Sequence, residues 1–398
     1  MNAAEIQGGR TLRADDAGRL AERIAGLIRQ GGPLPFDRFM ALALYEPGLG
    51  YYEREAGTIG REGDFFTSVS VGSCFGEMLA FRFAGWLEEL EAGTVWLIEA
   101  GAHDGRLMAD ILAWLDRWRP RLGSRLACGI LEPSPGRRAW QQARLEPWRD
   151  RIRWFASFGE LAHEAPRGIL FANELLDALP VRRFEWRAKA GGWQESSVGL
   201  APVGTGDTAG PAFRWEHRPM PSGAGSADRW LRRQLDLARD LAPALPDGFV
   251  WEHGAFAIEW WRQAADCMME GWLLTLDYGE LEGGAFLPER PQGTLRAFAG
   301  HRQTPDLLNA PGTRDLTADV DFALIRQSGE DAGWTTAAYT TQGRFLTEIA
   351  AEMTMSLEAV PRLDAGRRRQ LLTLVHPEHL GQRFKVLVQH RPETAHHD

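Results

Sequence analysis

The sequence predicts an α/β fold in which a parallel sheet is covered by helices on both faces. Six short apolar runs have the length of buried strands, and several of them end at a polar residue. Helical patterns separate most of these runs, which is the order expected for a parallel sheet. The runs occupy residues 95–98, 127–131, 152–156, 168–172, 271–276 and 384–388.

Apolar residues at helical spacing predict the helices. In the first helix, residues 17–30, Leu20, Ile24 and Ile28 recur at intervals of four, and the glycines at 31–32 end the pattern. Four further helices are predicted at residues 36–44, 74–90, 107–117 and 228–241.

The segments between these elements divide the chain. Residues 45–71 are rich in glycine and aromatic residues and are interpreted as one long ordered loop, a type of loop that is often functional. Residues 183–186 and 193–198 resemble a hairpin, and 202–225 are rich in Gly, Pro and Ser, as in a surface insertion. We therefore expect a helical N-terminal segment with the loop (1–92), a sheet core (93–180), an insertion subdomain (181–260) and the rest of the sheet (261–398).

The composition limits the class of protein. With 398 residues, 44% of them hydrophobic, and a net charge of −9, the chain has the composition of a soluble globular protein and lacks the basic character that nucleic acid requires. It contains no apolar run of signal-peptide length and none of the ~20 residues that span a membrane. Cys74, Cys128 and Cys267 are too widely spaced for a zinc site, and His376 and His379 lack a third ligand nearby. We expect a cytoplasmic protein without a metal ion, a nucleic-acid partner or a membrane span.

The first candidate site follows the predicted strand at 95–98. Glu99 ends this strand, and Gly101 and Gly105 lie in the turn that opens the next helix. Gly101 would let the backbone approach a ligand, and Gly105 would allow close contact between helix and strand. On these residues alone, a ligand-binding turn and a tight structural turn are equally acceptable.

The second candidate site is the end of the next predicted strand, where Glu132 is followed by Pro133. A carboxylate at this place can accept both hydroxyl groups of a ribose. Taken alone, Glu132 could be a solvated glutamate, but together with the glycine turn it indicates a nucleoside ligand. A nicotinamide dinucleotide would also fit, although the glycine spacing is not that of GxGxxG.

The third candidate site follows the predicted strand at 168–172, at the edge where open α/β sheets bind ligands. It consists of Asn173, Glu174 and Asp177. If the segment forms a helical turn, the two carboxylates share a face and could hold a guanidinium through charge-assisted hydrogen bonds. The alternative is an asparagine helix cap with solvated acidic residues.

These motifs and several others occur in an order that resembles the MidA family of methyltransferases. The three sites contain Glu-x-Gly-x-x-x-Gly at 99–105, Gly-Ile-Leu-Glu-Pro-Ser-Pro at 129–135 and Asn-Glu-Leu-Leu-Asp-Ala-Leu-Pro-Val at 173–181. The similarity covers roughly residues 17–391. Further matching segments are 39–52, 59–65, 67–77, 276–279, 294–301, 315–322, 341–346 and 380–386.

The resemblance implies a Rossmann-like class I methyltransferase sheet with a helical N-terminal segment and an inserted β-hairpin and helical subdomain. It also implies S-adenosyl-L-methionine as the cofactor. Glu99, Gly101 and Gly105 would line the methionine part, Glu132 would contact the ribose, and Gly63, Asp64 and Phe65 would close over the cofactor. Further expected cofactor-binding residues are Ala102, Pro133 and Asn173.

The family includes a mitochondrial complex I assembly-factor arginine methyltransferase, so the resemblance implies an arginine of a protein as the methyl acceptor. Glu174 and Asp177 would orient the guanidinium and accept a proton. Asp277, which we place in the catalytic set, or Tyr278 would shape the pocket. The alternative is a cofactor-binding assembly factor with little catalysis. The acceptor protein, for which a respiratory complex I subunit or its bacterial counterpart is the family precedent, and a homo-oligomeric state stay open.

Overall fold

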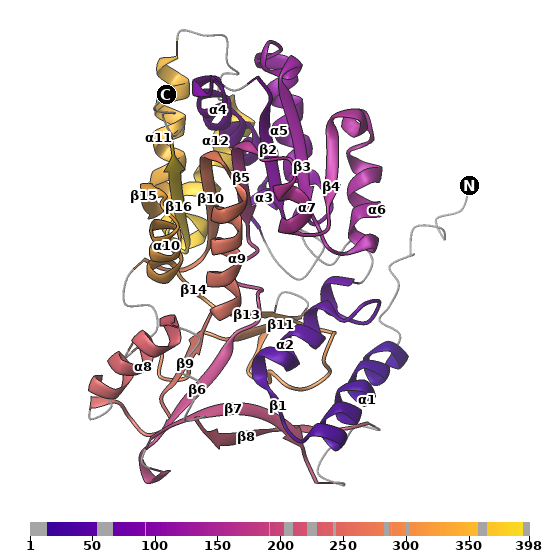
Figure 1. The fold of residues 1–398 in the computed structure, drawn as a ribbon, viewed down its shortest axis with the longest axis vertical. Coiled ribbons are helices and arrows are strands. Elements are labelled where there is room, and N and C mark those ends of the chain that lie inside the picture. Colours follow the sequence, from indigo (N-terminus) through magenta and orange to yellow (C-terminus); the bar gives the residue numbers. More distant parts are fainter. Residues whose placement is uncertain are drawn as a thin grey trace.

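An eight-stranded sheet is the largest element of the fold (Figure 1), which is known from a computed structural model. The structure describes residues 14–53, 67–91, 93–190, 192–202, 210–220, 229–241, 244–281, 286–287, 289–299, 302–356 and 364–392. The strand order is β15-β16-β10-β5-β2-β3-β4, β14 lies beside the end of β10, and β16 runs antiparallel to its neighbours. The strands are β2 (Val95–Ala100), β3 (Leu126–Leu131), β4 (Ile152–Phe155), β5 (Arg167–Asn173), β10 (Glu270–Glu280), β14 (Val320–Asp321), β15 (Thr335–Thr341) and β16 (Phe384–Arg391).

The strand order reverses between β2 and β5. From β2 the chain continues outward to β3 and β4, and it then returns to add β5 and β10 on the other side of β2. In open α/β sheets, such a switch point leaves a crevice at the carboxyl ends of the strands, and ligands bind there. The register places Ala100 opposite Ala172 and Leu276 opposite Asn173, so the ends of β2, β5 and β10 meet at one edge.

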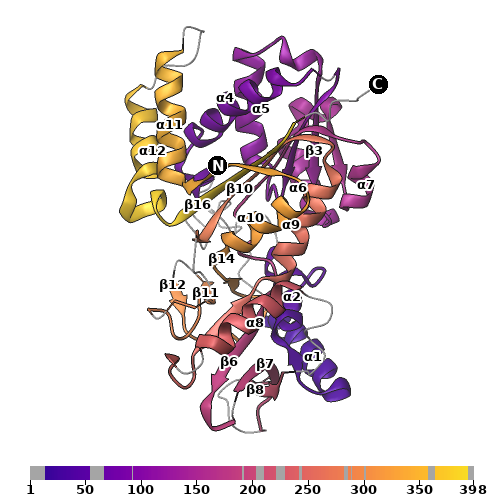
Figure 2. The same ribbon diagram turned by 60° about the vertical axis from the view of Figure 1, so that its left-hand side comes forward.

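Helices cover both faces of this sheet (Figure 2). Buried apolar side chains of α4, α5, α11 and α12 pack on one face, and those of α7, α9 and α10 pack on the other. The helices and helical turns of this part are α3 (Ser68–Val71), α4 (Cys74–Glu89), α5 (Arg106–Trp118), η2 (Leu122–Ser124), α6 (Pro135–Arg144), η3 (Glu146–Arg151), α7 (Phe158–Ala162), α9 (Ala255–Cys267), α10 (Phe322–Asp331), α11 (Gln342–Met355), α12 (Ala365–Val375) and η6 (Pro377–Gly381).

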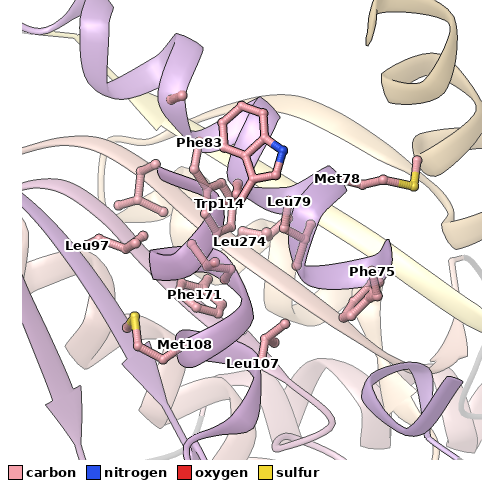
Figure 3. Close-up of a cluster of buried hydrophobic side chains, with 14 of the residues drawn as sticks. Phe75, Met78, Leu79, Phe83, Leu97, Leu107, Met108, Trp114, Phe171 and Leu274 are labelled. Carbon is pink, nitrogen blue, oxygen red and sulfur yellow. The ribbon is translucent and has the colours of Figure 1, made fainter. Parts of the chain in front are cut away.

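Apolar side chains fill the space between α4, α5 and the sheet (Figure 3). Phe83 of α4 and Phe171 of β5 are fully buried, and their ring centroids are 5.1 Å apart. An ion pair links α12 to α4, because Arg367 donates hydrogen bonds of 2.6 and 2.9 Å to the two carboxylate oxygens of Glu77. The glycine turn and the strand ends are therefore built on a rigid, closely packed core.

A second, antiparallel sheet and the first two helices form the lower part of the molecule in Figure 1. The sheet has the order β1-β7-β6-β9 with β8 beside β7, and α1 and α2 pack on it through Leu20, Ile24 and Phe39, which share a buried cluster with Val198. A small sheet, β12-β11-β13, lies nearby. The elements are α1 (Ala14–Gly31), β1 (Leu34–Pro35), α2 (Phe36–Tyr45), η1 (Tyr51–Glu53), β6 (Arg182–Arg187), η4 (Ala188–Ala190), β7 (Gly192–Leu200), β8 (Phe213–Pro219), α8 (Arg229–Leu241), β9 (Val250–His253), β11 (Arg296–Ala299), β12 (Arg302–Thr304) and β13 (Asp315–Thr317).

The structure confirms the predicted secondary structure at most places. All six predicted strands are present, as β2, β3, β4, β5, β10 and β16, and the five predicted helices are α1, α2, α4, α5 and α8. The predicted hairpin is the antiparallel pair β6 and β7. The thiols of Cys74, Cys128 and Cys267 are free and buried.

Other elements, α3 and β15 among them, were not predicted. The end of the predicted loop forms the short helix α3, which is stabilised because Thr67 and Ser70 exchange side-chain to backbone hydrogen bonds at its start. Strand β15 was not predicted, because its sequence Thr-Thr-Ala-Ala-Tyr-Thr-Thr has no strongly apolar run. None of the helices in the described ranges is both long and apolar enough to cross a membrane.

Candidate active site

A cavity with a volume of about 860 Å³ lies at the switch point, between the eight-stranded sheet and the lower part of the molecule. Residues at the carboxyl ends of β2, β5 and β10 line one side, and residues of α2, η1, β11 and β13 line the other. Of the residues predicted from the sequence, the cavity brings together Glu99, Gly101, Asn173, Glu174 and Asp177.

Glu99 is the carboxylate at the end of β2. It lines the cavity with only 3% of its surface exposed, and burial, with a smaller effect of the Asp104 charge, raises its pKa to about 8. Its Oε2 atom is buried without a hydrogen-bond partner among the described residues, and so is Oδ1 of Asn173 at the end of β5. Two such acceptors beside one cavity suit a cationic donor such as an ammonium group.

The turn after β2 requires its glycines for two reasons. Gly101 and Gly105 have φ angles of 69° and 82°, in the left-handed region that favours glycine. In addition, a Cβ atom at Gly101 would lie 2.8 Å from Leu175 Cδ1, and one at Gly105 would lie 3.0 Å from Leu145 Cδ1. The close neighbour of Gly105 is thus the segment after α6 and not the strand that we predicted. Gly101 lines the cavity, whereas Gly105 and Ala102 do not.

The same turn contributes His103 and Asp104, which the sequence did not indicate as site residues. Asp104 accepts hydrogen bonds from Arg144 (2.8 Å) and from the backbone N–H of Arg106 (3.1 Å). Burial alone would raise the pKa of Asp104, but its interactions with His103 and Arg144 outweigh burial and lower it to about 2. The ionised Asp104 contributes to the raised pKa of Glu99. The feature of the sequence that could have indicated both residues is their place in the turn that follows a predicted strand.

Glu132 lies directly after β3 and is 1% exposed. Its Oε1 accepts a hydrogen bond from the backbone N–H of Ser134 (3.0 Å), and its Oε2 accepts one from Gln141 Nε2 (3.1 Å). The cavity lining includes Arg137, whose Nε is 3.6 Å from Glu132, but it includes neither Glu132 nor the exposed Pro133. A contact of these two residues with a ribose stays a prediction.

The segment around α3 borders the cavity through Thr67, Val69 and Ser70. The backbone N–H of Ser68 donates a hydrogen bond of 3.2 Å to Glu174 Oε1. The segment therefore both lines the cavity and contacts an acidic residue of the site. The residues expected to close over the cofactor, which precede this segment, lie outside the described residues; they are Gly63, Asp64 and Phe65.

Glu174 and Asp177 lie in the turn after β5, and both line the cavity. The helical turn considered in the sequence analysis is not formed, because residues 174–179 are bends and turns and Glu174 has a φ of 54°. This left-handed backbone costs a non-glycine residue about 1–2 kcal/mol, so the surrounding structure must hold it. The two carboxylates share the cavity through this turn rather than through a helix face.

Both carboxyl groups hold a proton more tightly than they would in water. Burial, with a smaller effect of the Asp177 charge, raises the pKa of Glu174 to about 8, although Asn173 and Ser68 donate hydrogen bonds to it. Burial also raises the pKa of Asp177 to about 6, against the positive charge of Arg296. A cation bound beside them would lower both pKa values.

Asp277 has a different position from the other two acidic residues. It is fully buried at the end of β10, and the cavity lining does not include it. Burial, with a smaller effect of the Asp177 charge, raises its pKa. Its oxygens accept hydrogen bonds from backbone N–H groups of the turn after β5. The next residue, Tyr278, lines the cavity.

Two tyrosines on the far side of the cavity were not assigned to a site from the sequence. The hydroxyl of Tyr45 donates to the carbonyl oxygen of Ala178 (2.9 Å), and that of Tyr52 donates to Asp315 Oδ1 (2.8 Å). The two rings are stacked with centroids 5.6 Å apart. Tyr45 thus contacts the turn that carries Glu174.

Charged residues complete the far side. Arg290 and Arg296 both form ion pairs with Asp319, and Arg290 is also 3.1 Å from Glu280. Arg296 and Asp319 belong to motif segments of the sequence, but nothing in their spacing indicates that they meet at a cavity. Within the described ranges, no group of three or more His, Cys, Asp or Glu side chains is placed to hold a metal ion.

The strand order, with β16 antiparallel between β10 and β15, and the cavity at the switch point define a Rossmann-like α/β fold. Residues 78–340 match the family described as S-adenosyl-L-methionine-dependent methyltransferases, and the chain belongs to this family. It is therefore a methyltransferase, and S-adenosyl-L-methionine is its cofactor.

Known proteins resemble the chain over most of its length. A Danio rerio protein named protein arginine methyltransferase NDUFAF7, mitochondrial, is 28% identical over 393 residues, which cover 92% of this chain and 85% of the relative. The Homo sapiens protein of the same name is 27% identical and covers 90% and 80%. A crystal structure of a Burkholderia thailandensis protein bound to S-adenosyl-homocysteine has a TM-score of 0.78 and 28% identity, with 96% of this chain and 94% of that chain covered.

These relatives correct one prediction. The Danio rerio and Homo sapiens relatives are named as mitochondrial proteins, which contradicts the cytoplasmic location that we expected from the sequence. The expectation was based on composition, and the composition of a globular protein does not distinguish one aqueous compartment from another. The prediction of location is therefore wrong.

Proposed function

We propose that this methyltransferase transfers the methyl group to a guanidinium nitrogen of an arginine in a protein. The observation that carries the proposal is the pair Glu174 and Asp177, two carboxylates on one turn in the cavity that Glu99 also lines. The Danio rerio and Homo sapiens relatives are named protein arginine methyltransferases, which supports the same acceptor.

The β2 end of the cavity suits the amino-acid part of the cofactor. Glu99 Oε2 and Asn173 Oδ1, both without partners, would accept hydrogen bonds from its ammonium group. Leu107 at the start of α5 also lines the cavity, and its backbone N–H would suit the carboxylate, because those of Arg106 and Met108 already bond Asp104 and Glu99. When bound, S-adenosyl-L-methionine supplies an electrophilic methyl group on a positively charged sulfur.

The acceptor requires more help, because a guanidinium keeps its proton and is a poor nucleophile. Glu174 and Asp177 would hold it by charge-assisted hydrogen bonds and fix the position of the reacting nitrogen. This nitrogen gains the methyl group and loses one proton. With a pKa of about 8, the carboxylate of Glu174 is a stronger base than an ordinary glutamate and would accept that proton.

The proposal can be tested with methyl-labelled S-adenosyl-L-methionine and a set of peptides that contain arginine, each paired with a peptide that has lysine in its place. Acid hydrolysis should release labelled methylarginine from the arginine peptides. Glu174→Gln and Asp177→Asn should each lower kcat by about 100-fold or more. Glu348→Gln, an exposed position on α11, is the matched control and should behave as the wild type.

Each part of the proposal can fail separately. Label on another amino acid would contradict the arginine acceptor. Methylation that persists at the wild-type rate in both variants would contradict the role of the carboxylate pair. Cofactor binding without transfer to any peptide or protein would favour an assembly factor with little catalysis.

A further inference from the structure

The turn after β5 is held largely from outside, and one backbone hydrogen bond, from the N–H of Leu179 to Leu176 O (3.2 Å), closes within it. Glu174 is left-handed, and the turn contains no helical hydrogen-bond pattern. A free chain would leave this conformation, since it is unfavourable for a residue with a Cβ atom. The groups that hold the turn therefore determine where Glu174 and Asp177 point.

One carboxylate contacts most of the N–H groups of this turn. Oδ2 of Asp277 accepts hydrogen bonds from the backbone N–H groups of Leu175 (3.1 Å), Leu176 (2.8 Å) and Asp177 (3.3 Å). Its Oδ1 accepts a fourth from the N–H of Tyr278 (2.8 Å). Successive N–H groups that converge on one oxygen form a binding site for an anion. A carboxylate at the end of β10 meets this need, since β10 lies beside β5 in the sheet.

We propose that Asp277 is a positioning residue, which holds the turn after β5 so that Glu174 and Asp177 face the acceptor. The proposal rests on the function proposed above for these two carboxylates. Asp277 does not line the cavity, so it acts through the turn and not by contact with the acceptor. It is therefore not a catalytic residue itself.

A second contact links Asp277 to the chemistry of the site. Each of the two carboxyl groups acts on the other, because Asp277 lowers the pKa of Asp177 through a side-chain interaction, against the effect of burial, and the Asp177 charge raises the pKa of Asp277. The orientation of the Asp177 carboxyl group thus depends on Asp277 as well. The other ionisable groups that act on Asp177 or are affected by it are Tyr45, Tyr52, Glu174, Tyr278, Arg296 and Asp319.

Other hydrogen bonds hold the same turn from different sides. The N–H of Glu174 donates to Leu276 O, the N–H of Ala318 donates to Asp177 O, each at 2.9 Å, and the Tyr45 hydroxyl donates to Ala178 O. These bonds do not involve the Asp277 carboxylate. Its loss should therefore displace the turn without unfolding the sheet.

The test compares Asp277→Asn with Asp321→Asn. Like Asp277, Asp321 lies outside the cavity lining and accepts a backbone N–H, from Leu324 at 3.2 Å, but this N–H belongs to α10 and not to the turn after β5. Hydrogen exchange of a peptide covering residues 172–180 should be roughly tenfold faster in Asp277→Asn. Its kcat should fall roughly 100-fold, while the Kd of S-adenosyl-homocysteine stays within about threefold. Asp321→Asn should leave all three quantities unchanged.

Unchanged exchange in residues 172–180, or a kcat within about threefold of the wild type, would overturn the proposal. If Asp277→Asn does not fold, Asp277→Glu carries the same test, because it keeps the carboxylate but moves it by one methylene. Exchange and cofactor binding need no acceptor. A wild-type protein that methylates no arginine would thus contradict the proposed function, and unchanged exchange would contradict the role of Asp277.

Discussion

Glu99 gives the protein a pH dependence that can be measured without any substrate. Its carboxyl group is buried at the end of β2, and burial raises its pKa from the ordinary value of 4.5 to about 8. Between these pH values, Glu99 carries a proton in the folded protein and none in the unfolded chain. Glu99→Gln replaces the carboxyl by a neutral group of similar shape and removes this difference.

The sign of the effect follows from proton linkage. The folded state binds one proton more than the unfolded state, so the free energy of unfolding falls as the pH rises, by about 1.4 kcal/mol per pH unit. The stabilisation that depends on the protonated Glu99 carboxyl group is fully present below pH 4.5 and is lost as the pH rises to about 8. Over two pH units within this window, Glu99 alone accounts for at most about 2.7 kcal/mol. Glu174 changes stability in the same direction, but it does so in both proteins and cancels in the comparison.

Urea unfolding at about pH 5.5 and about pH 7.5 measures this difference. We expect the wild type to lose up to about 2.7 kcal/mol more than Glu99→Gln over the interval. Glu348→Gln, at an exposed position, should follow the wild type. Equal pH dependence in the wild type and Glu99→Gln would refute a raised pKa of Glu99.

Four further predictions concern binding, catalysis and stability. An ammonium group pairs with Glu99 only when its carboxyl group is ionised, so cofactor binding at about pH 6.5 should release about one proton. Calorimetry in two buffers that differ in ionisation enthalpy detects this release, which should be absent in Glu99→Gln. The pH profile of kcat/KM should rise up to about pH 8 as Glu174 loses its proton, and a flat profile between pH 6 and 8 would contradict this role. Gly101→Ala should lower the free energy of unfolding by about 1–2 kcal/mol and weaken cofactor binding, because the backbone at position 101 has a φ of 69° and the added Cβ would meet the Leu175 side chain. Unfolding curves and calorimetry that match the wild type would disprove this. Arg367→Ala should cost about 1–3 kcal/mol of unfolding free energy, because it leaves the largely buried Glu77 carboxylate without its guanidinium partner, and the Kd of the cofactor should not change.

The central sheet and its ligand-binding edge were predictable from the sequence. Each buried strand is a continuous apolar run, and the carboxyl ends of parallel strands lie side by side. The polar residues that end three of these runs, Glu99, Asn173 and Asp277, therefore had to meet at one edge. This inference needs no knowledge of the loops, which explains why it succeeded.

The shape of the turn after β5 was not predictable. Glu174 and Asp177 are three residues apart, a spacing that suits a helix equally well. The observed conformation depends on Asp277, whose carboxylate lies 100 positions beyond Asp177 in the sequence. The far side of the cavity was not predictable for the same reason, since the hydrogen bond between Tyr52 and Asp315 joins residues that are 263 positions apart. No local pattern encodes such contacts.

The positions of three side chains indicate that the two ends of the cavity are coupled. Asn173 donates a hydrogen bond of 3.1 Å from Nδ2 to Glu174 Oε1, while its Oδ1 has no partner among the described residues. An ammonium group that is held by Glu99 and also donates a hydrogen bond to Oδ1 of Asn173 would fix the orientation of the Asn173 amide. The same amide would then keep its donor on Glu174 and favour the ionised carboxylate that an arginine needs. In the binding mode proposed above, a cofactor held at Glu99 and an acceptor held at Glu174 should therefore each strengthen the binding of the other.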